Sequence, residues 1–319
     1  MDNFLRNIKV TIGITCFNAE NTISKAIHGA INQDWANKEI IIIDDGSRDS
    51  SQEIIKDFQN YKQIKFLKNN HNKGTSYSRN EIVKNSEGDI ICFMDDDDFS
   101  LPNRVSSQIK ELKNADYPNN KLIACSASMT RKYNSGYERK LISMGTNGRL
   151  PKGYELANYL LFYERERGVD YGFGLPTASM LITKECFQKV GLFDENLERV
   201  EDMDLSIRLS FAGVKFVSAN KNLVLQNSNQ KEKKAAKNFH SEKTLIKKYK
   251  KYLDEKNLYW HCQQWPKLRF FYFQKKYLCL FFTLIILIIK NPKRTLLHFF
   301  YTGIRRLILD MRLFKSRYF

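Results

Sequence analysis

Four consecutive aspartates, Asp95 to Asp98, follow an apolar segment that ends at Met94. Adjacent carboxylates repel one another, so a folded protein tolerates four of them only if solvent or a positive charge offsets the repulsion. A hard divalent cation such as Mn2+ or Mg2+ prefers oxygen ligands and would supply that charge. An Asp-rich turn is the alternative interpretation, because aspartate is common in turns. The position at the end of an apolar segment leads us to favour a metal site.

A second acidic turn, Asp44-Asp45-Gly46-Ser47, closes another apolar segment. A carboxylate at this place can accept the N–H of a uracil or a comparable donor on a nucleotide base, and the glycine lets the chain turn closely. A plain turn followed by a helix start would use the same residues. The sequence leaves both interpretations open.

A third acidic pair, Glu201-Asp202, stands at the start of a predicted helix. The helix dipole favours acidic residues in a first turn, so helix capping is one explanation. The other is that Asp202 serves as a general base that accepts the proton of an attacking hydroxyl. Asp204 lies two positions further on and is expected to point away from Asp202.

Strands and helices alternate along the segment that carries the first two clusters. Helices are predicted after Asn21 or Thr22, after Ser50 or Ser51, and from Gly74 to Lys84. This alternation predicts an α/β fold with a mostly parallel sheet flanked by helices, whose ligands bind at the carboxyl ends of the strands. The four predicted strands are Val10–Thr15, Glu39–Ile43, Ile64–Leu67 and Asp89–Met94.

Less regular patterns follow up to residue 225. They predict a helix over about 102–114, a strand near 121–129, an apolar segment with turns over 172–192, a helix over about 202–212, and short strands at 215–217 and 223–225.

Several motifs of the chain occur together in one known family. They are Val10–Asn18, Ile43–Ser47, Asn72–Gly74, Ser78–Asn80, Gly88–Asp98, Val190–Glu195 and Glu201–Leu205. In order and spacing, over roughly residues 8–225, the chain resembles the family 2 glycosyltransferases. That resemblance implies the GT-A nucleotide-diphospho-sugar transferase fold and an inverting transfer.

The resemblance also implies roles for individual residues. Asp45 would bind the base, Asp97 would bind a metal that bridges the diphosphate, and Asp202 would be the general base. Glu201 would help to orient the acceptor. The residues expected to contact the nucleotide sugar are Thr15, Phe17, Asn18, Glu20, Asp45, Asn72, Gly74, Arg79, Asp95 and Asp96.

The chain departs from the family pattern in two places. Thr15 and Phe17 stand where the family usually has Pro and Tyr, so a stacking ring is kept but a hydroxyl is lost. Many members also carry a His or Arg shortly after the last strands, which closes on the diphosphate. Lys231, Lys233 and His240 are the candidates for that role here.

Charge divides the chain into two segments. Residues 1–230 carry 30 Lys and Arg and 30 Asp and Glu, whereas residues 231–319 carry 22 and 5, so the whole formal charge of +17 lies in the second segment. We therefore predict a catalytic domain over 1–230 and a basic, helical C-terminal region over 231–319 that meets an anionic surface.

The C-terminal region combines this charge with apolar residues. Tyr277–Ile289 is uncharged, but it is too short to cross a membrane, because a membrane-spanning helix needs about 20 residues. Leu296–Leu309 adds a basic amphipathic stretch, and together the two segments favour a position in the membrane interface. A helix packed on the catalytic domain is the alternative. Nucleic acid is not expected as a partner, because no nucleic-acid-binding module is recognisable.

Cysteine usage and the N-terminus bear on location. The six cysteines are single and form no Cys-x-x-Cys pair, which predicts reduced, mostly buried thiols. No apolar segment precedes the first strand, so we do not expect a cleaved signal peptide. The expected location is the cytoplasm, peripheral on the inner face of the cell membrane.

The expected activity is transfer of a sugar from a nucleotide-diphosphate donor, UDP-linked by preference, to a hydroxyl of a glycan or lipid-linked acceptor. Bacterial surface-polysaccharide synthesis is the expected setting. A membrane-associated sugar nucleotidyltransferase is a rival, but 15–22 contains no glycine for the phosphate loop it would need. A catalytically inactive scaffold is a second rival, which the presence of Asp95, Asp97 and Asp202 disfavours.

Overall fold

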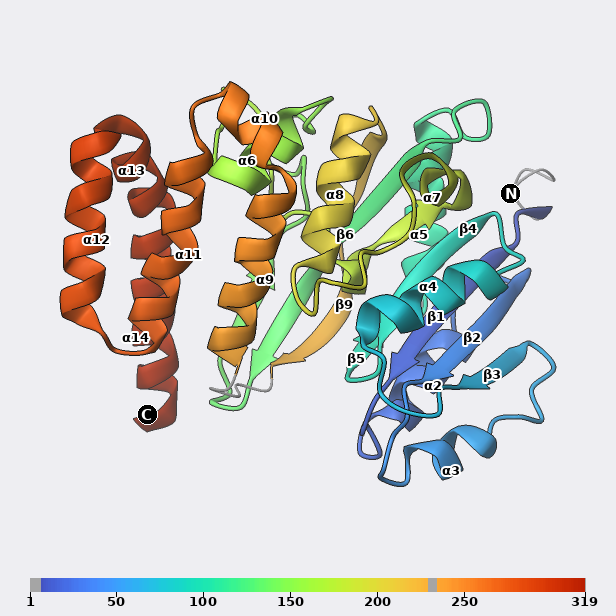
Figure 1. Ribbon diagram of the computed structural model, residues 1–319. Helices are drawn as coiled ribbons and strands as arrows, with labels where there is room; N and C mark the ends of the chain where they lie inside the picture. The colour runs from blue at the N-terminus through green and yellow to red at the C-terminus, as the bar shows by residue number, and fades with distance from the viewer. Residues whose placement is uncertain (1–6, 229–233, 319) are drawn as a thin grey trace.

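The computed structural model describes residues 7–228 and 234–318. Its strands are β1 (Val10–Cys16), β2 (Lys38–Asp44), β3 (Ile64–Lys68), β4 (Ile90–Asp95), β5 (Asp98–Ser100), β6 (Ile123–Tyr133), β7 (Glu138–Leu141), β8 (Leu181–Thr183) and β9 (Lys215–Ser228). They form one sheet in the order β3-β2-β1-β4-β8-β6-β9-β5, with β7 paired to β6 (Figure 1).

The first four strands of this order are parallel, as the alternation of strands and helices predicts. The helices that connect them are α2 (Ile23–Ile31), α3 (Ser51–Lys56) and α4 (Thr75–Asn85). They cover the sheet on its two sides, which confirms the predicted α/β class (Figure 1).

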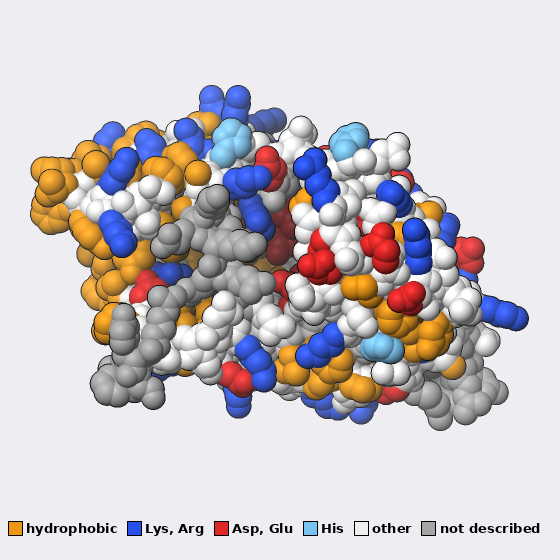
Figure 2. All heavy atoms as spheres, turned by 90° about the horizontal axis from the view of Figure 1, so that it is seen from below, with side chains coloured by type: hydrophobic (Ala, Val, Ile, Leu, Met, Phe, Trp, Pro, Cys, Tyr) orange, Lys and Arg blue, Asp and Glu red, His pale blue; other side chains and the backbone are white. Residues whose placement is uncertain are grey.

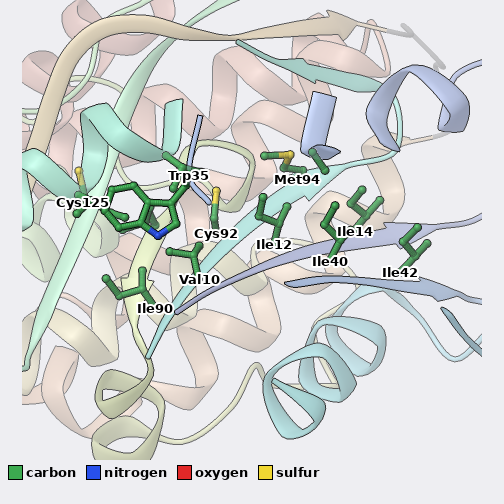
Figure 3. Close-up of a cluster of buried hydrophobic side chains, with 14 of the residues drawn as sticks. Val10, Ile12, Ile14, Trp35, Ile40, Ile42, Ile90, Cys92, Met94 and Cys125 are labelled. Carbon is green, nitrogen blue, oxygen red and sulfur yellow. The ribbon is translucent and has the colours of Figure 1, made fainter. Parts of the chain in front are cut away.

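Side chains of alternate strand residues build a core on each face of the parallel half. Ile12 lies beside Ile40 and Cys92 in the neighbouring strands, and all three are fully buried in one cluster (Figure 3). Ile41 and Phe93 belong to a cluster on the other face. This two-sided burial explains why the strands read as continuous apolar runs rather than alternating ones.

The second half of the sheet adds strands in mixed directions. β6 runs parallel to β9 but antiparallel to β8, and β5 is antiparallel to β9. The two short strands expected at 215–217 and 223–225 are one continuous strand, so that prediction is wrong in detail. Polar residues Asn220 and Lys221 break the apolar pattern, and the register shift between Ala127 and Ser128 absorbs them as a bulge.

The remaining helices of the first segment are α5 (Arg104–Asn114), α6 (Glu155–Phe162), α7 (Lys184–Val190) and α8 (Glu201–Phe211). In the second described segment the helices are α9 (Lys234–Lys248), α10 (Lys250–Glu255), α11 (Tyr259–Phe273), α12 (Tyr277–Lys290), α13 (Pro292–His298) and α14 (Ile304–Tyr318), with a π-helical turn at Phe299–Gly303. Figure 1 shows the last of these standing beside the sheet, away from α2 and α3.

The C-terminal helices begin by packing on the sheet domain. Leu245 and Leu253 share a buried cluster with Leu161 of α6 and Ile207 of α8. Further on, α12 exposes most of its side chains. In 7–228 and 234–318 no helix has both the length and the apolar character needed to cross a membrane. The predicted division at residue 230 falls between the described segments and stays a prediction.

All six cysteines are free, and every one except Cys279 is buried. This confirms the expectation of unpaired, mostly buried thiols.

Candidate active site

Three of the predicted site residues, Thr15, Asp45 and Asp95, lie at or directly after the carboxyl ends of three neighbouring strands. The register sets Thr15 of β1 beside Ile43 of β2 and Asp95 of β4, and Cys16 beside Asp44. The three strands therefore end level with one another, and the polar residues that follow them meet at one edge, as predicted. The backbone of the sheet fixes this edge before any ligand is present.

Two loops at this edge are tied to each other. Asn18, whose φ of 51° is left-handed, donates its N–H to Ser47 Oγ at 2.9 Å and accepts the Arg48 N–H at 2.9 Å. Glu20 accepts the N–H of Ser50 at 3.1 Å. These contacts place Asn18 and Glu20 in a rigid rim. Phe17, between β1 and the rim, keeps 44% of its surface exposed and offers a ring on which a base could stack.

Asp45 organises a third loop of the rim. Its carboxylate accepts a hydrogen bond from Asn69 Nδ2 at 2.7 Å and from the N–H groups of Lys73 and Gly74 at 2.9 and 2.8 Å. The carboxylate therefore holds the segment that contains Asn72 and Gly74 against the end of β2. Binding of a nucleotide base by Asp45 stays a prediction. The base would donate to carboxylate oxygens that already accept hydrogen bonds from three donors.

Gly46 permits the turn that brings these loops together. Its φ is +73°, and a Cβ at this position would lie 2.7 Å from the carbonyl carbon of His71. Only a glycine lets the two backbone segments approach so closely, which confirms the role expected for it.

Burial and mutual repulsion raise the pKa values of two residues in the aspartate run. Burial, together with the charges of Asp97 and Asp95, raises the pKa of Asp96 to about 7. Burial and the same two neighbours raise the pKa of Asp98 to about 8. Asp98 Oδ1 is buried without a hydrogen-bond partner among the described residues. A divalent cation with oxygen ligands would offset the charge of such a run.

The protein alone does not complete a metal site in the part of the chain that the structure describes. There, no three Asp, Glu, His or Cys side chains come together as a ligand set. The oxygens of a diphosphate have the chemistry of ligands for a hard divalent cation. The assignment of Asp97 as the metal ligand stays a prediction.

Arg79 links the aspartate run to the third acidic pair. Its Nη2 donates to Asp95 Oδ1 at 3.0 Å and its Nη1 donates to Glu201 Oε1 at 2.6 Å. Burial alone would lower the pKa of Arg79, but the two carboxylates raise it above its usual value, so the side chain stays charged. The guanidinium thus joins the end of β4 to the start of α8. Asp95 lies 16 positions from Arg79 in the sequence, and Glu201 lies 122 positions from it.

Asp202 lies beside this bridge, in the first turn of α8. Burial and the charge of Glu201 raise the pKa of Asp202 to about 6, while the charge of Arg79 opposes the shift. The N–H of Met203 donates to Asp202 Oδ1 at 2.7 Å. Val200, just before the helix, has a φ of 60°, a strained conformation for a β-branched residue. A partly buried carboxylate with this pKa suits a general base near neutral pH.

Comparison with known sequences decides the family. Residues 11–175 match the family described as glycosyl transferase family 2, which covers more than half of the 319 residues. The chain belongs to glycosyl transferase family 2.

Two of its curated relatives come from Escherichia coli and Bacillus subtilis. WfgD of Escherichia coli, a UDP-Glc:alpha-D-GlcNAc-diphosphoundecaprenol beta-1,3-glucosyltransferase, is 36% identical over 109 residues, which cover 34% of this chain and 41% of that protein. YfnE of Bacillus subtilis, an uncharacterized glycosyltransferase, is 26% identical over 248 residues, 66% of this chain and 62% of that protein. The alignments thus span less than two thirds of either relative's length.

A solved structure with the same fold is TarS 1–349 of S. aureus in complex with UDP-GlcNAc. It superposes with a TM-score of 0.59 over 90% of this chain and 83% of that chain, at 15% sequence identity. This likeness confirms the predicted GT-A fold.

Asp204 of this family 2 glycosyltransferase has a structural role and turns away from Asp202, as expected. It is fully buried, accepts from Arg208 Nε at 2.8 Å and from the Tyr249 hydroxyl at 2.8 Å, and pairs with Lys248 at 2.9 Å. These contacts fasten α8 to the first C-terminal helix.

The structure also brings two residues of β9 to the site of this family 2 member, for which no role was predicted. Gln226 Nε2 donates to Asp98 Oδ2 at 3.1 Å, and Asn227 Nδ2 donates to the carbonyl of Asp97 at 3.0 Å. Both residues follow the strand predicted at 223–225, the place where the resemblance implies a His or Arg that closes on the diphosphate. His240 is exposed on α9, and Lys231 and Lys233 lie outside the described residues, so that role stays unassigned.

Arg104 is a second residue that sequence reasoning missed. Its guanidinium is fully buried beneath the aspartate run, where it donates to Ser100 Oγ at 2.8 Å and to the Phe93 carbonyl at 2.9 Å. It supports the turn between β4 and β5 from inside the protein. A single arginine in a predicted helix carries no local signal for this position.

Proposed function

We propose that this chain transfers a sugar from a UDP-sugar to a hydroxyl of a lipid-linked glycan, with inversion, at the cytoplasmic face of the membrane. The observation that carries the proposal is the Arg79 bridge, which holds a carboxylate run at the strand ends next to a general-base candidate, Asp202. Surface-polysaccharide synthesis is the proposed setting.

The donor would lie over the ends of β1, β2 and β4. Phe17 would stack on the base, Asp45 would accept its N–H, and Asp95 would contact the ribose. Two observations support UDP as the nucleotide: TarS is solved with UDP-GlcNAc, and WfgD is named for a UDP-Glc donor. Asp97 would hold a divalent cation, which would neutralise the charge that develops on the diphosphate.

Asp202 would accept the proton of the acceptor hydroxyl as that oxygen bonds to the anomeric carbon. The bond from this carbon to the diphosphate oxygen breaks in the same displacement, and the nucleoside diphosphate leaves with the bonding electrons. A single displacement from the opposite side inverts the configuration, and it needs one base and no second carboxylate nucleophile. Glu201, held by Arg79, would orient the acceptor.

The exposed side of the C-terminal helices supports a position at the membrane. We call the side of α12 formed by Leu278, Phe281, Phe282, Ile285, Ile286 and Ile289 its outer face, and all six residues are exposed. Lys275, Lys276 and Lys290 flank it. Figure 2 shows apolar side chains with Lys and Arg between them on this part of the molecule. Such a surface suits the interface of an anionic membrane.

The test is a transfer assay with a panel of nucleotide sugars and sugar-diphospholipid acceptors, with and without Mn2+. We expect transfer from one UDP-sugar, dependence on the cation, and an inverted linkage by NMR. Asp202→Asn should abolish transfer while nucleotide binding survives. Transfer by Asp202→Asn at the native rate would remove this residue from its role. Nucleotide binding without any transfer would favour the inactive scaffold.

A further inference from the structure

A groove of about 1290 Å3 lies among the C-terminal helices, apart from the carboxylate site. Its walls come from α9, α11, α12, α14 and the end of β6. Figure 1 shows these helices grouped beside the sheet. Most of the lining is apolar or aromatic, for example Phe239, Trp265, Leu268, Leu280, Leu284 and Leu313. This volume and lining suit a long apolar ligand rather than a soluble glycan.

One side of α12 forms a wall of the groove. Leu280 and Leu284 point into it, while Phe281 and Ile285 belong to the outer face. The spacing of four residues places each pair on one side of the helix. Tyr277 also lines the groove and is 60% exposed, so the rim of the groove adjoins the surface that we propose to lie on the membrane.

One residue of the groove wall is linked to the active site. Arg131 of β6 lines the groove and donates from Nε to Gln226 Oε1 at 2.7 Å. Gln226 in turn donates to Asp98 at 3.1 Å. Two hydrogen bonds therefore connect the groove to the aspartate run. Arg131 therefore places a positively charged guanidinium in the wall of the groove.

We propose that this groove binds the hydrocarbon chain of the acceptor, a lipid diphosphate, with Arg131 at the end that receives the diphosphate. The inference rests on the proposed function and adds the binding site for the lipid part of the substrate. The chain would enter from the membrane side past Tyr277, and the attached sugar would reach toward Asp202. An arginine suits this place because its fork binds phosphate oxygens in pairs.

The groove can be tested without a donor. The probes are isoprenyl diphosphates of ten and twenty carbons, with the dissociation constants measured below the micellar concentration. Since each buried methylene adds affinity, the native protein should bind the longer probe at least about tenfold more tightly. In Leu280→Gln/Leu284→Gln the ratio of the two dissociation constants, ten-carbon probe over twenty-carbon probe, should fall below about threefold. Phe281→Gln/Ile285→Gln, on the outer face of the same helix, should keep the native ratio.

Two further variants keep the test from depending on the α12 variant alone. Arg131→Ala should weaken both probes by about tenfold and leave their ratio unchanged, since it removes only the contact with the diphosphate. Ala235→Phe narrows the groove from α9 and should lower the ratio in the same way as the α12 variant. This second variant decides the question if the α12 variant does not fold.

An equal ratio in the native protein and in both groove variants would overturn the proposal. Displacement of the twenty-carbon probe by phosphatidylglycerol at equal concentration would also overturn it, because the groove would then be a site for bulk lipid. Chain-length discrimination without sugar transfer from any nucleotide sugar would refute the proposed function and keep the groove. Sugar transfer without discrimination between the two chain lengths would refute the groove and keep the proposed function.

Discussion

Asp202 shows how one residue acquires a chemical property from its surroundings. Burial and the charge of Glu201 raise its pKa to about 6. A general base works in its ionised form, so kcat/KM should be constant above pH 7 and should fall about tenfold per pH unit well below pH 6. The pH–rate profile measures this directly. A profile that stays flat down to pH 5 would assign the proton transfer to another group.

Arg79 is the residue on which the assembly of the site depends. Arg79→Lys keeps the charge but replaces the two Nη donors, which reach Asp95 and Glu201 from a planar fork, with a single nitrogen on a shorter side chain. We expect kcat to fall by about 10- to 100-fold with little change in Tm. Steady-state kinetics and thermal unfolding separate the two effects.

A matched control for this variant lies on the same helix. Lys84 pairs with Glu81 on the exposed surface, and Lys84→Ala should change neither kcat nor Tm appreciably. Equal kinetics in Arg79→Lys and the native enzyme would show that the bridge does not position the site.

At the scale of elements, the loop after β2 depends on one close approach of backbone segments. Gly46→Ala would set a Cβ 2.7 to 2.9 Å from the backbone of His71 and Asn72 and would strain a φ of +73°. We expect a loss of about 1–3 kcal/mol in the free energy of unfolding and weaker nucleotide binding. Chemical denaturation and calorimetric titration with UDP measure the two quantities.

Gly136→Ala is a control that adds backbone strain without a steric clash at the new Cβ. Gly136 has a similar φ of +81° but open space around its Cβ position. That variant should lose less stability than Gly46→Ala and should bind UDP normally. Equal losses in both variants would show that the contact with His71 contributes nothing.

At the scale of the whole molecule, the C-terminal helices combine two kinds of surface. Leu309 and Leu313 of α14 pack on Tyr133 of β6, while the side chains of the outer face of α12 are exposed. The alternative of a helix packed on the catalytic domain therefore holds for α14, and a position in the membrane interface stays a prediction for α12. Deleting 270–319 should release the protein from membranes, but it would also uncover Tyr133.

Point substitutions on the outer face test membrane association without that side effect. Phe281→Ser/Ile285→Ser should lower binding to anionic vesicles by at least about tenfold and leave Tm unchanged, because both side chains are exposed. Cosedimentation at low and high salt measures the binding, and its salt dependence reports the contribution of the lysines. Full retention on vesicles, or a native protein that never binds them, would contradict the proposed location.

The sequence by itself determined the parallel half of the sheet and the edge at which Asp45 and Asp95 meet. These features follow from local patterns, since apolar runs set the strands and the residues after them must lie at their carboxyl ends. The continuous strand β9, the buried Arg104 and the two partners of Arg79 were decided only by the tertiary structure. Gln226 meets Asp98 across 128 positions, and Glu201 meets Arg79 across 122. Contacts of that range depend on strand register and helix packing, for which a local pattern carries no signal.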